Sequence, residues 1–221
     1  MIVLHAERLV AFIDSELIDM PVARRLVTAL LTTAVLATPL LTQAAGGLAD
    51  VPQPEGAPET FLMVNEIPAG SAIKYELDEA GHVIVDRFLS MPMAYPANYG
   101  SIPSSLGGDG DPLDVMAFTR TPIMPGAIMA VRPIGMLRMV DGGEADDKII
   151  AVPTHAVDPT WDEIKSVDDL PAMERERLEG FFRVYKQLPE GGKVIELKGF
   201  APMSEAQEVL QKALDTYQSP S

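Results

Sequence analysis

Three aspartates, Asp109, Asp111 and Asp114, lie within a run of six residues. The run follows Gly107-Gly108 and precedes an apolar, β-prone stretch, which places it where a loop meets a strand. Side chains in such positions can converge on a cleft with side chains from distant segments. Carboxylates that share a cleft repel each other, and divalent cations remove that electrostatic cost. Sites made only of carboxylate oxygens suit hard ions such as Mg²⁺ or Mn²⁺.

A second acidic group begins at Asp141, contains Glu144, Asp146 and Asp147, and ends at Lys148 before another apolar stretch. It repeats the loop-to-strand placement of the first group. Read alone, either group is as well explained by ordinary solvated turn residues, because aspartate and glycine are common turn formers. An EF-hand calcium loop does not match, since that pattern needs an oxygen ligand and then a glycine where the first group has leucine and aspartate.

The composition removes several other kinds of site. The chain has 221 residues, no cysteine and three histidines. Thiolate nucleophiles, Cys-ligated zinc and iron–sulfur clusters are therefore excluded. No histidine falls in a motif with serine or aspartate, so a Ser-His-Asp triad is poorly supported, and His82 and His155 are expected to be surface or strand residues. The sequence has no Gly-rich loop ending in Lys-Ser or Lys-Thr, which argues against a P-loop enzyme.

The formal net charge of −15 argues against plain nucleic-acid binding, because phosphate backbones require patches of lysine and arginine. An acidic protein still binds an anionic substrate when divalent cations lie between the two.

Residues 95–100 are expected to form a turn that contains two tyrosines. Simple packing explains these tyrosines as well as a functional role does. Basic and phenolic groups beside metal-bound carboxylates are what a phosphoryl substrate requires, and the candidates are Lys74, Arg87, Tyr95, Tyr99, Lys148, Tyr185 and Lys186.

Local patterns predict an α+β fold. One helix is expected over residues 168–186, with Pro171 in its first turn, and a second from Ser204 to about Tyr217, opened by a capping box of Ser204 and Gln207. Strands that precede helices favour an antiparallel barrel or sheet with helices packed on it. Strands are expected at 82–88, 113–119, 127–137, 148–152 and 194–200.

The first 60 residues differ from the rest of the chain. Arg24-Arg25 precede an uncharged apolar run, residues 26–41, and small residues follow it. This order is typical of a secretory signal peptide, and the run is short for a membrane span. Because residues 1–19 carry acidic side chains, we expect translation to start at Met20 and cleavage to occur near Ala44. A buried or amphipathic N-terminal helix and an uncleaved anchor are the alternatives.

The expected division of the chain is a signal-like extension over 1–44, a Pro-rich linker over 45–60 and a functional domain over 61–221. From about Phe61 to Tyr217 this domain resembles the soluble family I inorganic pyrophosphatases of the bacterial type. The resemblance rests on seven motifs in order: Glu66-Ile67-Pro68, Lys74-Tyr75-Glu76, Val85-Asp86-Arg87, Tyr95-Pro96-Ala97-Asn98-Tyr99-Gly100, Asp109-Gly110-Asp111-Pro112-Leu113-Asp114-Val115, residues 141–148, and Tyr185-Lys186.

The resemblance implies an OB-like, five-stranded β-barrel with flanking helices. It also implies hydrolysis of pyrophosphate to two phosphates with several Mg²⁺ ions, or with Mn²⁺ or Zn²⁺ as substitutes. By position, Asp109, Asp114 and Asp146 would hold the tightest ion, and Asp114 would bridge to a second. Asp141 and Asp146 would bind the ion that arrives with the substrate, and Glu66 would serve an outer ion.

The remaining roles implied by the resemblance concern the substrate. Asp111 would accept the proton of the attacking water, and Tyr99 would orient Asp111 or that water. Glu76 would support Lys74 or an outer metal ion. The groups that would grip the phosphates are Lys74, Arg87, Lys148, Tyr185 and Lys186.

Two departures from the family pattern concern assembly and location. Family members often carry histidines before the Tyr-Lys motif at the contact between trimers of a hexamer, whereas Gly180 and Val184 occupy that region here. A homohexamer remains the expectation. The signal-like extension predicts an exported or periplasmic protein, without stable membrane insertion once it is cleaved; the cytoplasm is the family default. The alternative functions are a metal- or phosphate-binding module that has lost catalysis and a broader polyphosphate or nucleotide phosphohydrolase.

Overall fold

The structure is a computed structural model that describes residues 47–78 and 80–219. The expected signal segment, the start at Met20 and the cleavage near Ala44 lie outside the described residues. By their contacts, residues 45–221 form a unit separate from residues 1–44. Within the described residues, no helix combines the length and apolar character needed to cross a membrane.

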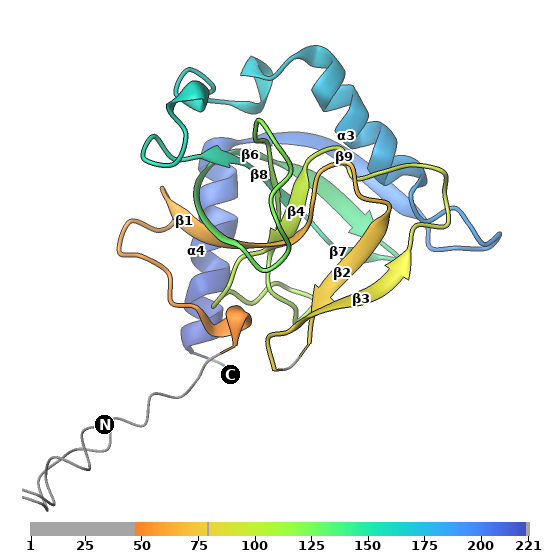
Figure 1. The fold of residues 1–221 in the computed structure, drawn as a ribbon, viewed down its shortest axis with the longest axis horizontal. Coiled ribbons are helices and arrows are strands. Elements are labelled where there is room, and N and C mark those ends of the chain that lie inside the picture. Colours follow the sequence, from red (N-terminus) through yellow and green to blue (C-terminus); the bar gives the residue numbers. More distant parts are fainter. Residues whose placement is uncertain (1–46, 79, 220–221) are drawn as a thin grey trace, which may run out of the picture. The chain divides into compact units, whose positions relative to one another are not determined.

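Five strands pair in a closed ring (Figure 1). In ring order they are β1 (Phe61–Ile67), β4 (Asn98–Ser101), β5 (Asp114–Ala117), β8 (Lys148–Pro153) and β6 (Ile128–Asp141). Each strand is hydrogen-bonded to the next, and β6 pairs back with β1. The β5–β8 pairing is parallel and the others are antiparallel. A sheet closed in this way has no free edge along the ring.

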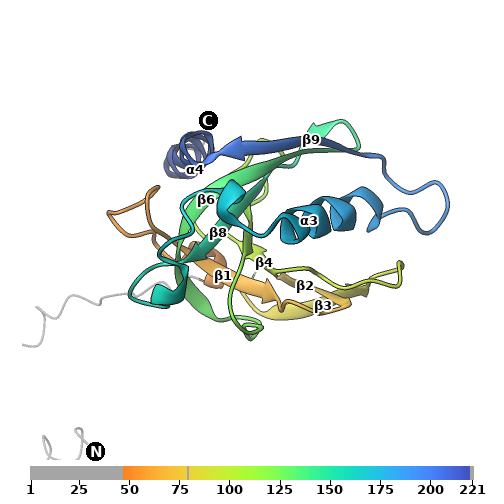
Figure 2. The ribbon, with the colours of Figure 1, turned by 90° about the horizontal axis from the view of Figure 1, so that it is seen from above.

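The other elements flank the ring. A separate hairpin consists of β2 (Ile73–Leu77) and β3 (Val83–Phe88), and β6 also pairs with β7 (Glu144–Ala145) and β9 (Ile195–Pro202). The α-helices of the described part are α3 (Ala172–Val184) and α4 (Met203–Gln218), and 3₁₀ turns occur at Leu48–Asp50, Pro159–Trp161 and Val167–Asp169. Figure 2 shows α4 beside β9, and α3 between β9 and the β2–β3 hairpin. This strand-dominated fold with two helices confirms the α+β class.

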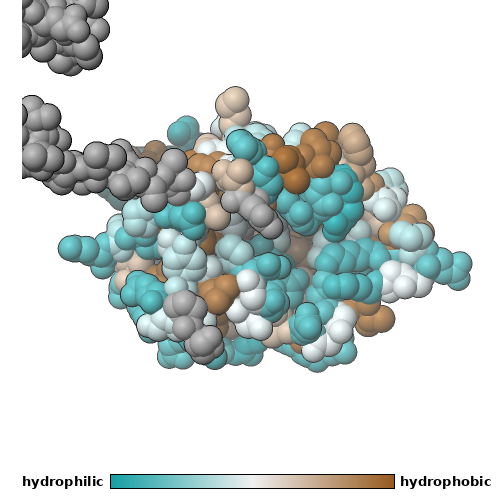
Figure 3. Space-filling view, turned by 90° about the horizontal axis from the view of Figure 1, so that it is seen from below, coloured by the Kyte–Doolittle hydropathy of each residue, from teal (hydrophilic) through white to brown (hydrophobic). Residues whose placement is uncertain are grey.

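Two apolar clusters form the core, and each includes one helix. In α4 the buried side chains recur at helical spacing and belong to the same cluster as Phe61 and Met63 of β1; they are Ala206, Leu210, Ala213 and Leu214. The second cluster includes Leu178, Phe181 and Phe182 of α3. Tyr185, directly after α3, belongs to the same cluster as these helix residues. Core packing therefore fixes the position of the Tyr185-Lys186 motif. On the face seen in Figure 3 the surface is mainly hydrophilic, with apolar side chains in small groups.

All of the strands and both helices predicted from local patterns are present, with shifted ends. The main difference is β4, because the sequence predicts a turn over residues 95–100 whereas Asn98–Ser101 form a buried strand. Gly100 lies opposite Asn65 of β1, and a Cβ atom there would stand 1.9 Å from the carbonyl oxygen of Val64. The glycine that suggests a turn therefore allows two strands to approach closely.

The helix starts also differ from prediction. The capping box of Ser204 and Gln207 is wrong, because α4 begins at Met203 and no side chain caps it. Strand β9 runs directly into α4, so Ser204 is already inside the helix. Helix α3 begins later than predicted, because Pro171 has an extended backbone (ψ 135°) that separates α3 from the preceding 3₁₀ turn.

Specific contacts join residues 47–60 to helix α4 and to strand β1. The hydroxyl of Tyr217 in α4 donates to Asp50 Oδ1 at 2.8 Å. The side-chain amide of Gln53 both donates to and accepts from the main chain of Leu62, at 3.0 and 2.8 Å. The described residues before β1 are thus held against α4 and β1.

Replacement of Gly100 by alanine is expected to destabilise the protein by about 2 kcal/mol or more, because the added methyl group collides with the β1 backbone, which cannot move aside cheaply. The free energy of unfolding from urea denaturation measures the effect. Gly180→Ala is the matched control: nothing lies within 4 Å of its Cβ position in α3, so the helix should become about 0.5–1 kcal/mol more stable. Equal stabilities of the two variants would contradict the steric argument.

Candidate active site

One pocket, with a cavity volume of about 600 Å³, gathers all the side chains to which the resemblance gives a role. They come from both acidic groups, the β2–β3 hairpin, β1, β4 and the end of α3. The predicted residues that line it are Glu66, Lys74, Glu76, Arg87, Tyr99, Asp109, Asp111, Asp114, Asp141, Asp146, Lys148, Tyr185 and Lys186. His82 and His155 do not line this pocket. Their side chains are exposed, as expected for surface residues.

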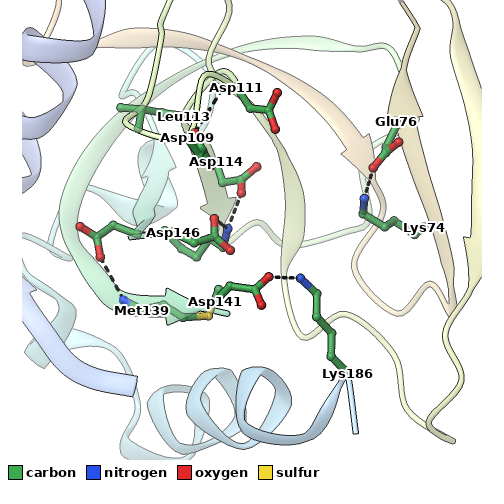
Figure 4. A network of polar contacts seen from close by, with 12 residues as sticks. Lys74, Glu76, Asp109, Asp111, Leu113, Asp114, Met139, Asp141, Asp146 and Lys186 are labelled. Carbon is green, nitrogen blue, oxygen red and sulfur yellow. Dashed lines mark hydrogen bonds and ion pairs between the residues drawn. The ribbon is translucent and has the colours of Figure 1, made fainter. Parts of the chain in front are cut away.

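Strand register places these side chains opposite one another. Asp114 and Lys148 are partners in the parallel β5–β8 pairing, although they are far apart in sequence. Lys74 and Arg87 are partners in the β2–β3 hairpin. Figure 4 shows the carboxylates of the first acidic group on one side of the pocket, with Lys74 and Glu76 facing them across an open space. The barrel therefore supplies most of the carboxylates, and the hairpin supplies cations.

Lys148 lies at the centre of the acidic residues. Its side chain is only 2% exposed, and its ammonium group donates hydrogen bonds to Asp114 and Asp146. Burial alone would lower the pKa of Lys148, but the two carboxylates outweigh burial and raise it. The ammonium also lies 5.8 Å from the centroid of the Tyr99 ring. Lys148 is therefore a permanent positive charge held between two candidate metal ligands.

Two carboxyl groups in the pocket have raised pKa values. Burial raises the pKa of Glu66 to about 7, against the lowering effect of a 2.5 Å hydrogen bond donated by the Ser101 hydroxyl. Partial burial raises the pKa of Asp111, and the negative charges of Asp109 and Asp114 raise it further. A carboxylate with a raised pKa accepts a proton more readily than an ordinary aspartate does.

The three tyrosines of the pocket remain protonated. Burial raises the pKa of Tyr99 well above its usual value, and the charge of Asp114 adds to this effect. Burial likewise raises the pKa values of Tyr95 and Tyr185. Tyr95 and Tyr185 both pack on the ring of Phe181 in α3, with centroids 4.7 and 5.2 Å away. Their protonated hydroxyl groups can therefore donate hydrogen bonds, and the core fixes their positions.

The hairpin side chains form an ion-pair network. Lys74 donates a hydrogen bond to Glu76 and lies 3.2 Å from Asp86. Arg87 donates to the same Asp86. Lys74 and Glu76 are two residues apart on β2 and so share a face of the strand. The contact joins Glu76 to Lys74, and the supporting role of Glu76 stays a prediction.

Lysine side chains are interleaved with the acidic residues of the pocket. Among the described residues, no three Asp, Glu or His side chains stand at the spacing of a preassembled metal site. Lysines lie between them instead, and Lys186 donates to Asp141 Oδ2. However, Asp141 Oδ1 is buried without a hydrogen-bond partner among the described residues. A desolvated, unpaired oxygen within an all-carboxylate set fits a hard divalent cation.

Two further pocket residues, Ser101 and Lys193, are not singled out by the sequence patterns. Ser101 follows Tyr99 by two residues on β4, so a correct strand prediction would have placed both on one face. Lys193 stands in a polar loop after α3, next to Gly191-Gly192. Its positive charge is the one feature of the sequence that could have marked Lys193 as a pocket residue.

A family model described as inorganic pyrophosphatase matches residues 63–218. The chain belongs to the inorganic pyrophosphatase family. The matched range contains every predicted site residue. The family implies a divalent metal cofactor, in agreement with the carboxylate set of the pocket.

Known members of the pyrophosphatase family match over most of their length. The inorganic pyrophosphatase of Aquifex pyrophilus is 47% identical over 172 residues, which are 77% of this chain and 97% of that protein. The inorganic pyrophosphatase of Gluconobacter oxydans is 46% identical, and the match covers 71% of this chain and 91% of that protein. The crystal structure of the Thermus thermophilus inorganic pyrophosphatase has a TM-score of 0.75 at 36% identity, covering 78% of this chain and 99% of that one.

Proposed function

We propose that this member of the pyrophosphatase family hydrolyses inorganic pyrophosphate to two phosphates by direct attack of water. The main observation behind this proposal is that all the predicted site residues, from seven separate motifs, line one pocket. Relatives named inorganic pyrophosphatase, at 46 and 47% identity, support the same reaction. Because water is the nucleophile, no covalent enzyme intermediate is required.

The proposed cofactor is Mg²⁺, bound as several ions with the substrate. Asp109, Asp114 and Asp146 would hold the tightest ion, and Asp114 would also serve a second. Asp141 and Asp146 would take the ion that accompanies pyrophosphate, and Glu66 an outer ion. When bound, the divalent cations neutralise phosphate oxygens and lower the pKa of the attacking water.

The side chains of the chain perform the remaining steps. Asp111 accepts the proton of the attacking water, which its raised pKa favours. Tyr99, as a protonated donor, orients that water or Asp111. The positive charges and the Tyr185 hydroxyl hold the phosphate oxygens and stabilise the charge that develops on the leaving phosphate; these groups are Lys74, Arg87, Lys148, Tyr185 and Lys186.

Phosphate release from pyrophosphate by the purified full-length chain tests this function. With Mg²⁺ present, each pyrophosphate should yield two phosphates. Parallel assays with tripolyphosphate and ATP test the broader phosphohydrolase, and faster release from either would contradict the proposed substrate. No turnover with Mg²⁺, Mn²⁺ or Zn²⁺ would end the proposal, and tight pyrophosphate binding without turnover would favour the binding module.

For assembly, we propose the homohexamer expected from the resemblance, despite Gly180 and Val184 on α3. Analytical ultracentrifugation of the purified chain measures the number of subunits directly. A monomer at micromolar concentration would contradict the hexamer.

For location, we propose export, with the signal-like segment removed near Ala44. The mature N-terminus of native protein recovered from cell fractions decides this by mass spectrometry. An intact segment 20–44 on the soluble protein would rule out cleavage.

A further inference from the structure

An irregularity in strand β1 directs the Glu66 side chain into the pocket. In the β1–β4 pairing the register shifts between Asn65 and Ile67, so Glu66 is an extra residue on β1. Such a β-bulge turns a side chain out of the regular alternation of its strand. The Glu66 side chain lines the pocket, although the residue is only 8% exposed. The bulge thus presents a buried carboxylate to the candidate active site.

Ser101 of β4 is a hydrogen-bond partner of this carboxylate. Its hydroxyl group donates to Glu66 Oε1 at 2.5 Å, and Ser101 is buried as well. In the β4–β5 pairing Ser101 lies opposite Asp114. Strand β4 stands between β1 and β5 in the ring. Ser101 therefore lies between two carboxylates, Glu66 and Asp114, that come from different strands and are both candidate metal ligands.

The hydrogen bond restricts the orientation of the Glu66 carboxylate. Because the Ser101 hydroxyl is bonded to Oε1, Oε2 is the oxygen that would serve a cation or a cation-bound water. Carboxylates that ligate metal ions are usually hydrogen-bonded themselves, and loss of such a partner typically weakens metal binding by about 10- to 100-fold. Loss of the hydroxyl would also leave a buried acceptor without its donor, which favours other orientations of Glu66.

We propose that Ser101 is a positioning residue for the outer metal ion, because its hydroxyl group keeps Glu66 in the orientation that serves that ion. This inference rests on the proposed function and adds one residue to its site. Ser101 acts through Glu66 and has no part in proton transfer. Its loss should therefore weaken Mg²⁺ binding and change kcat at saturating Mg²⁺ less than about twofold.

The test compares Ser101→Ala with Ser104→Ala in the full-length chain. Ser104 is a matched control, because it is half-buried, its hydroxyl donates to the carbonyl oxygen of Val51 at 3.0 Å, and it lies outside the pocket lining. Calorimetry measures Mg²⁺ binding with methylenediphosphonate, a non-hydrolysable analogue, already bound. The weakest Mg²⁺ Kd should rise about tenfold in Ser101→Ala and less than about twofold in Ser104→Ala. Ser101→Thr, which keeps the hydroxyl, should restore the Kd to within about threefold.

A double-mutant cycle separates an effect through Glu66 from a general effect on the pocket. Glu66→Gln alone should raise the same Mg²⁺ Kd at least as much as Ser101→Ala does. Added to Glu66→Gln, the Ser101→Ala substitution should change the Kd less than about twofold further, because the carboxylate that it positions is already lost. Full additivity of the two substitutions would overturn the proposal.

Unfolding midpoints measured without Mg²⁺ report any loss of structure. A lower midpoint in Ser101→Ala with an Mg²⁺ Kd equal to that of Ser104→Ala would make the hydroxyl merely structural and overturn the proposal. An unmodified chain that binds no Mg²⁺ would overturn it too. If the unmodified chain binds Mg²⁺ but hydrolyses no pyrophosphate, the proposed function fails while the Kd comparison still decides the role of Ser101.

Discussion

Replacement of Asp111 by asparagine is expected to lower kcat for pyrophosphate by about 10²- to 10⁴-fold, the usual contribution of a general base. Asparagine has nearly the same shape as aspartate but cannot accept the proton of the attacking water. Asp111 is suited to this step because it lines the pocket and its partial burial raises its pKa. Initial rates of phosphate release under saturating pyrophosphate and Mg²⁺ measure the loss.

A binding measurement separates lost chemistry from lost structure. The Kd of methylenediphosphonate should change little in Asp111→Asn, since this residue is assigned a proton-transfer role and not a phosphate contact. Asp168→Asn is the matched control, because that side chain is 93% exposed and lies outside the pocket lining. Asp111→Asn activity within a few-fold of the control would show that another group accepts the proton.

The sequence predicts the members of the site better than it predicts their contacts. Motif order identifies Asp114 and Lys148 as site residues, and both do line the pocket. Their direct hydrogen bond depends on the parallel β5–β8 pairing, which joins residues 34 positions apart. No local pattern specifies that pairing, because parallel neighbours are set by the course of the whole chain. The burial of Lys148 is therefore knowable only from the fold.

Residues that act through a partner strand are also hard to predict. Gly100 is a turn former by its own chemistry, and its function in β4 is visible only from the backbone of β1 beside it. Ser101 is missed for the same reason, although its hydroxyl bonds to Glu66 inside the pocket. The start of α3, by contrast, is displaced by a local effect, the extended backbone of Pro171. Errors in the site thus come from tertiary pairing, and errors in the helix ends come from local geometry.

Removal of divalent cations with a chelator is expected to reduce pyrophosphate hydrolysis at least about 10³-fold, equivalent to roughly 4 kcal/mol of lost transition-state stabilisation. The proposed cations would neutralise carboxylates that otherwise attract the phosphate-binding lysines, such as Asp114 and Asp146, which pair with Lys148. Added Mg²⁺ should restore the rate. Hydrolysis that persists at full rate in excess chelator would contradict metal dependence.

Thermal unfolding of the full chain tests metal binding without using activity. Mg²⁺ at 100 times its Kd should stabilise the folded state by about 2.7 kcal/mol for each site that it fills, which raises the midpoint of unfolding. Asp146→Asn should weaken this rise, because one carboxylate shared by two proposed ions is lost. Asp168→Asn should leave the rise unchanged, because its side chain is solvated away from the pocket. An equal rise in both variants would place the Mg²⁺ sites elsewhere, whereas a rise lost only in Asp146→Asn ties cation binding to the acidic residues around Lys148.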